Sequence, residues 1–262
     1  MRRTHQKTLR ATCNSKIADF ARLGQPIENP DGQLVYIPRG GNILGVAHLD
    51  HVLKQPAKIT KNVITCPQLD DRLGAWVLLH LLDEMDCPPF DILLTDCEEV
   101  GMSTARHFAT DNDYNWIFSF DRAGNDVVLY DYEDDATSAL VGEYFHVGHG
   151  SYSDICALEH LGVKGFNFGV GYHNQHTCEC YANITDTIAN AEVFCWFARD
   201  HHATHLRHVH VPVDPWGVEY DETYDCCECK APLEDDWAYC PYCGTANYMC
   251  HVWQTSRRKE LF

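Results

Sequence analysis

The most informative residues of this chain are histidines and carboxylates that occur in a particular order. In chain order they are His48, Asp70, Glu98, Glu99, Asp121 and His176. Zinc accepts imidazole nitrogen and carboxylate oxygen, and a catalytic zinc site keeps one position open for water. A paired-metal site also needs a bridging carboxylate, separate ligands for each ion and a general base. The six residues supply that number, so the sequence predicts a two-zinc hydrolase.

The sequence around these residues suggests a separate chemical role for each. His48 and Asp50 are two residues apart on an expected strand, so their side chains point to the same face. Asp50 is therefore placed to orient the imidazole of His48 without binding the metal itself. Asp70 begins an expected helix and suits a bridging role, with Asp71 as the alternative. A turn after a strand could aim one residue of the Glu98–Glu99 pair at a metal and the other at the water.

The segments that must position these residues alternate between strand-like and helix-like patterns. Strands are expected over residues 33–38, 42–48, 63–66, 91–95, 116–120, 127–130 and 165–169. Helices are expected over residues 15–23, 70–85, 102–109, 154–161 and 186–201, and a turn over residues 25–32. This alternation favours an α/β three-layer sandwich with a mixed, mostly parallel sheet.

Three of the candidate positions follow the ends of apolar runs. His48 ends NILGVAH, the Glu98–Glu99 pair follows DILLT, and Asp121 follows WIFSF. Sites in open α/β sheets gather outside the carboxyl ends of the strands. We therefore expect these side chains to meet at one edge of the sheet. Asp154, in GSYSDI, is expected to cap a helix or to be a structural acid near the site.

The order of these motifs resembles the co-catalytic zinc exopeptidases, which include aminopeptidases, tripeptidases, carboxypeptidases and N-acyl amino acid deacylases. The matching segments are AHLD, LDDRLG, CEEVG, SFD and SDICALEHLGVKGFNFGVGYHNQHT, and the resemblance covers about residues 33–194. It implies these roles: His48 and Asp121 bind one zinc, Glu99 and His176 bind the other, Asp70 bridges them, and Glu98 is the general base.

The resemblance also bears on two open choices and on the overall size of the domain. His173 and His176 both lie in GYHNQHT, and the family pattern favours His176. Family members with Asp-Asn in place of Asp-Asp favour Asp70 over Asp71. Only 54 residues separate Asp121 from His176, and 21 separate His48 from Asp70. Neither interval has room for an inserted lid domain, so the chain is most similar to the single-domain aminopeptidase branch.

The implied activity is hydrolysis of an amide bond through a metal-bridged water. The first expectation is an aminopeptidase that acts on short peptides. The alternatives are a deacylase or other amidohydrolase of small N-acylated compounds, and a catalytically retired scaffold. Arg122, next to Asp121, is a candidate for reading a charged group of the substrate.

The C-terminal region carries a second metal-binding pattern. Two Cys-x-x-Cys pairs, Cys226 with Cys229 and Cys240 with Cys243, have the spacing of a zinc ribbon, in which four thiolates hold one structural zinc. So small a module would draw its folding free energy from the metal. The predicted organisation is a hydrolase domain over residues 1–202, a linker rich in His and Pro over 203–222, and a ribbon over 223–262. The ribbon is a candidate contact for a protein partner or a homo-oligomer.

Composition narrows the partners and the compartment. The formal charge is −18, from 38 acidic and 20 basic residues, which argues against nonspecific binding to nucleic acid or to acidic membranes. No apolar run approaches the length of a membrane-spanning helix. The closely spaced cysteines suit metal binding in a reduced protein better than disulfides. We therefore expect a protein of the cytoplasm, either of a cell or of a viral host.

Overall fold

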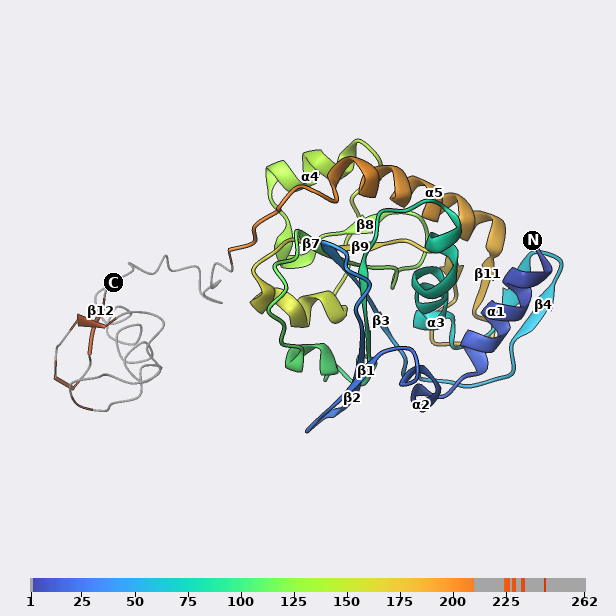
Figure 1. The fold of residues 1–262 in the computed structure, drawn as a ribbon, viewed down its shortest axis with the longest axis horizontal. Coiled ribbons are helices and arrows are strands. Elements are labelled where there is room, and N and C mark those ends of the chain that lie inside the picture. Colours follow the sequence, from blue (N-terminus) through green and yellow to red (C-terminus); the bar gives the residue numbers. More distant parts are fainter. Residues whose placement is uncertain (1, 210–223, 227, 230–231, 234–242, 244–262) are drawn as a thin grey trace, which may run out of the picture. The chain divides into compact units, whose positions relative to one another are not determined.

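The computed structural model describes residues 2–209, 224–226, 228, 229, 232, 233 and 243. The chain divides into two compact units, Met1–His210 and Val211–Phe262 (Figure 1). The first unit continues past the predicted domain end at residue 202. The backbone N–H of Leu206 donates to the carbonyl of Asn115 at 2.8 Å, and His208 is buried. Within residues 203–209, which were expected in the linker, Leu206 and His208 therefore contact this unit.

The first unit is built on a sheet of seven strands, and this sheet is mixed, as the sequence predicted. Its strands, in spatial order, are β1 (Gln25–Asn29), β2 (Gly32–Ile37), β6 (Asp91–Thr95), β3 (Ile43–His48), β7 (Trp116–Ser119), β9 (Gly165–Phe168) and β8 (Val127–Val128). The four central strands, β6, β3, β7 and β9, run parallel. The strands at the two edges of the sheet pair antiparallel. The carboxyl ends of the central strands therefore meet at one edge of the sheet.

A smaller antiparallel sheet holds the segment that contains His176. In spatial order its strands are β10 (Tyr172–His173), β11 (Tyr181–Asn183), β5 (Val63–Thr65) and β4 (Lys58–Thr60). The residues between β10 and β11 form a loop over 174–180, and this loop includes His176. The pairing of β11 with β5 ties that loop to the part of the chain just before Asp70.

Helices cover both faces of the main sheet. The α-helices are α1 (Arg3–Asn14), α2 (Ile17–Phe20), α3 (Leu69–Trp76), α4 (Asp135–Gly142) and α5 (Ile184–His201). Shorter helical segments are η1 (Val77–Leu81), η2 (Leu82–Glu84), η3 (Thr104–His107), η4 (Tyr130–Tyr132) and η5 (Asp154–Leu161). Figure 1 shows α1 and α3 on one side of the sheet. η3 and η5 pack on the opposite side of the sheet, where their apolar side chains belong to a second core cluster.

The alternation of side chains along the strands creates these two layers of core. In β6, Ile92 and Leu94 join the larger apolar cluster, whereas Leu93 joins the smaller one. In β7, Phe118 faces the first cluster and Ile117 the second. The predicted three-layer arrangement is therefore confirmed.

The amino-terminal region differs from the sequence-based expectation. A helix was expected over 15–23, but the longer helix is α1, which precedes it. Its buried side chains include Leu9 and Cys13 beside the polar His5 and Thr12, so its apolar periodicity is weak in the sequence. The turn expected over 25–32 is shorter, because residues 25–29 pair with β2 as an edge strand.

Two other segments also differ from the expectation. The helix expected over 102–109 is only the short 3₁₀ segment η3, since Ser103 caps it and Phe108 is already extended. α4 was not expected, and it begins where the side chain of Asp134 accepts the backbone N–H of Thr137. In the part of the chain that the structure describes, no helix is long and apolar enough to cross a membrane.

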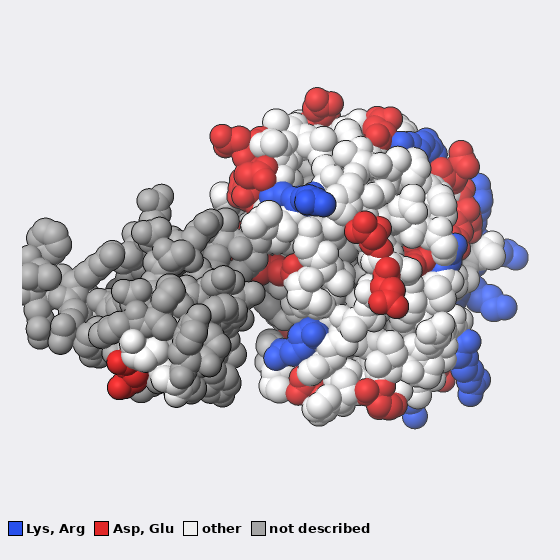
Figure 2. Space-filling view, turned by 60° about the vertical axis from the view of Figure 1, so that its left-hand side comes forward, with Lys and Arg blue, Asp and Glu red and all other residues white. Residues whose placement is uncertain are grey.

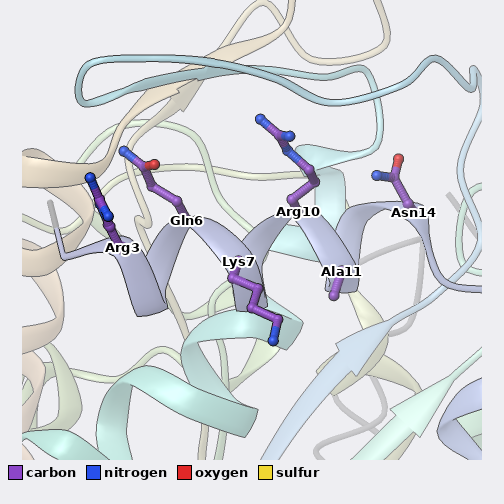
Figure 3. A pocket seen from close by; sticks show the side chains of 6 residues that line it. All are labelled: Arg3, Gln6, Lys7, Arg10, Ala11 and Asn14. Atoms are coloured by element: carbon purple, nitrogen blue, oxygen red, sulfur yellow. The ribbon is translucent and has the colours of Figure 1, made fainter.

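Basic side chains are unevenly distributed on the surface of this acidic protein. Figure 2 shows acidic side chains scattered over one face and many Lys and Arg side chains along its right-hand edge. The outward side of α1 lines an open pocket of about 520 Å³, with Arg3, Gln6, Lys7, Arg10, Ala11 and Asn14 (Figure 3). This pocket shares no residue with the predicted metal centre.

An aromatic cluster holds α5 on the sheet, and its contribution can be measured. Phe194 is fully buried, with ring centroids 4.6 Å from Phe118, 4.9 Å from Phe120 and 5.0 Å from Phe168. Phe194→Ala should lower the free energy of unfolding by about 3–5 kcal/mol, because it removes a ring and leaves a cavity. Trp196, in the same helix, is 55% exposed, and Trp196→Ala should cost about 0.5 kcal/mol or less. Urea unfolding would compare them, and equal losses would contradict the role of the cluster.

Candidate metal centre

The predicted site residues converge at the carboxyl edge of the parallel strands. His48 is the last residue of β3, and Glu98 and Glu99 follow the end of β6 at Thr95. Asp121 lies two residues beyond the end of β7. Because β6, β3 and β7 are adjacent and parallel, their ends place these side chains together. Asp70 comes from the start of α3, and His176 from the loop over 174–180.

The first group of possible metal donors contains His48, Asp70 and Asp121. Their donor atoms lie within 4.8 Å of one another. His48 Nε2 is 3.3 Å from Asp70 Oδ1 and 3.6 Å from Asp121 Oδ1. The imidazole is almost completely buried, with 1% of the side chain exposed. These atoms could act together as ligands of one ion.

The second group contains Asp70, Glu99 and His176. His176 Nε2 lies 3.1 Å from Asp70 Oδ2 and 3.1 Å from Glu99 Oε2. Asp70 therefore belongs to both groups, and its two carboxylate oxygens face different histidines. That is the placement a bridging carboxylate needs. The side chain of His176 is 53% exposed, so this half of the site opens to solvent.

The structure separates the residues that the sequence left as alternatives. Asp71 is fully buried, and its Oδ1 accepts the backbone N–H of Gly74 at 3.1 Å. His173 lies in β10, where its ring is 5.1 Å from that of Tyr181. Among the described residues, neither joins a group of possible metal donors, whereas Asp70 and His176 do.

Glu98 lies beside the first group and outside both sets of donors. Its Oε2 is 3.8 Å from His48 Nε2, and 13% of its side chain is exposed. Burial raises the pKa of Glu98 to about 8, and the negative charge of Asp121 adds to this effect. Glu98 is thus a largely buried carboxyl group whose Oε2 lies near the same nitrogen of His48 that faces Asp70 and Asp121.

Asp50 connects the histidine to the glutamate pair. Its Oδ1 lies 3.4 Å from His48 Nδ1, on the side of the ring that faces away from the donors. Its two oxygens also accept the backbone N–H groups of Glu98 at 3.2 Å and of Glu99 at 3.1 Å. The sequence suggested the contact with His48 but gave no signal for these backbone contacts, because they join segments far apart in the chain.

Two further residues that the sequence did not single out position Asp121. Ser153 Oγ donates to Asp121 Oδ2 at 3.0 Å. The side-chain amide of Asn167, in β9, accepts the backbone N–H of Asp121 at 3.0 Å and donates to its carbonyl at 2.8 Å. Ser153 and Asn167 are both buried. Asn167 lies in β9, which neighbours β7, and Ser153 precedes η5, so spacing along the chain could not reveal either contact.

The electrostatics of the site favour bound cations. Burial raises the pKa of Asp121 to about 7, and the neighbouring charge of Asp70 contributes. Burial also raises the pKa of Glu99, again with Asp70 as the next cause. Burial alone would lower the pKa of His48, but the carboxylates of Asp121 and Asp50 raise it well above its usual range. Divalent ions would offset this crowding, and the nitrogen and oxygen donors suit zinc.

The second unit brings three of the four predicted ribbon cysteines together. Sulfur atoms of Cys226, Cys229 and Cys243 lie within 4.8 Å of one another, and Cys226 Sγ is 3.5 Å from Cys243 Sγ. A hydrogen bond from the backbone of Cys229 lowers the pKa of Cys226 to about 6, which favours the thiolate that binds metal. β12 (Tyr224–Asp225) pairs antiparallel with β13 (Pro232–Leu233). Cys240 lies outside the described residues, and the ribbon remains a prediction.

Comparison with known proteins gives the fold a set of structural relatives. No family model matches the sequence, and no curated protein sequence matches it. An aminopeptidase from the archaeon Desulfurococcus kamchatkensis aligns over 77% of this chain and 95% of its own, with 13% identity and a TM-score of 0.55. A tripeptidase from Staphylococcus aureus aligns over 75% and 96%, with 11% identity and a TM-score of 0.54.

A third relative is a TET peptidase from Pyrococcus horikoshii. It aligns over 73% of this chain and 99% of its own, with 12% identity and a TM-score of 0.53. That peptidase can assemble into a tetrahedron or a large octahedral shell. The α/β unit described here therefore has the fold of these aminopeptidases and tripeptidases, as the resemblance of its sequence motifs predicted.

Proposed function

We propose that this chain is a zinc-dependent exopeptidase, specifically an aminopeptidase that acts on short peptides. The position of Asp70 carries the proposal. Its two oxygens lie 3.3 Å from His48 and 3.1 Å from His176, and each histidine has a second carboxylate beside it. His48 and Asp121 would hold one zinc, and Glu99 and His176 the other, with Asp70 between them.

Glu98 is the proposed general base. It would take a proton from the attacking water and return it to the leaving amine. Bound zinc would polarise the substrate carbonyl and lower the pKa of that water. Asp50 supports Glu98 by accepting its backbone N–H, and it also faces His48. The exposed side of His176 leaves a path for the substrate from solvent.

The arginines near the site favour recognition of a free amine over a free carboxylate. Arg122, a candidate for substrate recognition, donates to both oxygens of Asp126 at 2.9 and 2.7 Å. Arg72 is buried and donates to the carbonyl of Leu49, and Arg106 donates to the carbonyl of Ser103. All three guanidinium groups are engaged, while carboxylates surround the site. This arrangement supports an aminopeptidase over a deacylase that must bind the carboxylate of an N-acyl amino acid.

The ribbon over residues 223–262 would hold one structural zinc with Cys226, Cys229, Cys240 and Cys243. The assemblies of the TET peptidase support a homo-oligomer here, and the ribbon is a second candidate for a protein contact. Free thiols at Cys13, Cys66 and other positions support a reducing compartment, the cytoplasm of a cell or of a viral host.

Removing the carboxylate of Glu98 should abolish peptide hydrolysis while the metal stays bound. Glu98→Gln keeps the size of the side chain but cannot accept the proton, so kcat should fall by about 10²–10⁴-fold. The exposed Glu143 provides a matched control, and Glu143→Gln should keep wild-type activity. Steady-state assays on short peptides, combined with elemental analysis, would check both. Unchanged hydrolysis in Glu98→Gln would rule out this residue as the base.

The number of zinc ions should respond separately to changes in the two units. Wild-type protein should contain about three zinc ions per chain, and Asp70→Ala about one, because a bridging ligand serves both catalytic ions. Cys243→Ser should remove only the ribbon ion and leave about two. Elemental analysis of the purified full-length variants provides the counts. Identical zinc content in wild type and Asp70→Ala would contradict the paired site.

Substrates that differ only at their termini should separate an aminopeptidase from a deacylase. Acetylation of a peptide's amino terminus should lower kcat/KM by about tenfold or more, because a group that the site binds is then missing. Amidation of the carboxyl terminus should change kcat/KM by less than about threefold. Competition assays with the matched peptides would measure this. A preference for the acetylated form would instead favour the deacylase.

A further inference from the structure

Glu98 and Glu99 lie on a tight loop that needs support from outside itself. This loop, residues 96–102 and here named the Glu98 loop, lies between the end of β6 and Ser103, the cap of η3. Its backbone is left-handed at Cys97 (φ 63°) and Gly101 (φ 69°). Within the loop, the backbone N–H of Gly101 donates to the carbonyl of Glu98 at 2.7 Å. These short-range contacts shape the turn but do not fix its orientation over the sheet.

Asp154 connects the two ends of the Glu98 loop. Its Oδ2 accepts a hydrogen bond from the hydroxyl of Thr95 at 2.5 Å, just before the loop begins. Its Oδ1 accepts a hydrogen bond from the hydroxyl of Ser103, just after the loop ends. Ser103 Oγ also accepts the backbone N–H of Ala105, so the same hydroxyl caps η3. One carboxylate thereby sets the distance between the end of a strand and the start of a helix.

Burying the carboxylate of Asp154 costs free energy unless hydrogen bonds compensate for the lost water. Asp154, Thr95 and Ser103 are each exposed by 1% or less. A buried carboxylate is stabilised by charge-assisted hydrogen bonds, which are stronger than those between neutral groups. Both donors come from the boundaries of one loop, although Asp154 follows Ser103 by about fifty residues of chain. The sequence suggested a helix cap or a structural acid near the site. Ser153 occupies the cap position of η5, and the side chain of Asp154 instead accepts hydrogen bonds from Thr95 and Ser103.

We propose that Asp154 is a positioning residue, whose bonds to Thr95 and Ser103 hold the Glu98 loop so that Glu98 reaches the reacting groups. The effect on turnover rests on the proposed function, whereas the effect on the loop does not. Asp50 holds the middle of the loop through the backbone N–H groups of Glu98 and Glu99. Asp154 holds the two ends of the loop, and its hydrogen bonds go to Thr95 and Ser103 rather than to a proposed ligand. It can therefore be changed without removing a metal ligand.

Asp91 provides a matched control at the opposite end of β6. It is also a buried carboxylate, and its Oδ2 accepts the hydroxyls of Tyr36 at 2.7 Å and Tyr114 at 2.8 Å. Its Oδ1 accepts the backbone N–H groups of Arg39 and Gly41. Asp91 begins β6 and Thr95 ends it. Asp154→Asn and Asp91→Asn therefore both neutralise a buried acceptor of two hydroxyl groups. Only Asp154→Asn changes the support of the Glu98 loop.

The test compares turnover, zinc content and amide hydrogen exchange in these two full-length variants. Asp154→Asn should lower kcat by about a hundredfold with little change in KM, because small displacements of a catalytic group have effects of that size. Its zinc content should stay at the wild-type value, and peptides covering residues 96–102 should exchange faster. Asp91→Asn should keep kcat and the exchange of this loop, even where its stability falls.

Changes at the donors keep the test valid if Asp154→Asn folds poorly. Thr95→Val keeps the shape of the side chain but lacks the hydroxyl, and it should repeat the loss of kcat and the faster exchange. Thr95→Ser restores the hydroxyl and should recover most of the activity. Because Thr95 and Asp154 act through one bond, the double variant should lose less than the sum of the two single losses.

The outcomes separate this proposal from the proposed function. If the wild type shows no peptidase activity but residues 96–102 exchange faster in Asp154→Asn, the loop contact is supported and the peptidase function is rejected. An active wild type with equal behaviour of Asp154→Asn and Asp91→Asn, in kcat and in loop exchange, would overturn the positioning role. Full activity in Thr95→Val would also overturn it.

Discussion

The concentration of carboxylates at one edge of the sheet is the constraint on which the site depends. Asp50, Asp70, Glu98, Glu99, Asp121 and Asp154 gather near two histidines, and most of these side chains are largely buried. Burial, and then repulsion by neighbouring carboxylates, raises the pKa values of Glu98 and Asp121. Divalent ions would offset the cost of burying such a cluster, so this edge of the sheet could hold metal.

The parallel centre of the sheet delivers these groups to one place. β6, β3 and β7 are neighbours, and each ends next to a residue of the site. The apolar side chains of the same strands fill the two layers of core, so the strands cannot shift without breaking packing. The aromatic rings between β7, β9 and α5 add to this stiffness. Because packing fixes the strands, polar contacts need to position only the loops that follow the strand ends.

Those polar contacts form a supporting layer beneath the candidate ligands. Asp50 holds backbone groups of Glu98 and Glu99, while Ser153 and Asn167 hold Asp121. Each of these residues comes from a different segment than the group it supports. Metal ligands in proteins are commonly oriented by residues that do not bind the metal, because ligand geometry determines both affinity and reactivity. The present arrangement extends that support to the loop that carries the proposed base.

The sequence by itself determined the fold class, the strands that end at the site and the residue types available for metal. These follow from apolar periodicity and from short motifs, which are local properties of the chain. It did not reveal α1, whose buried face includes His5 and Thr12, or the edge strand β1. The sequence motifs favoured Asp70 and His176 over Asp71 and His173, and the tertiary structure brings the first two into groups of possible metal donors. Only the tertiary structure shows that Asp154 contacts Thr95 and Ser103. The physical reason is that such contacts depend on where distant segments meet, which chain spacing does not encode.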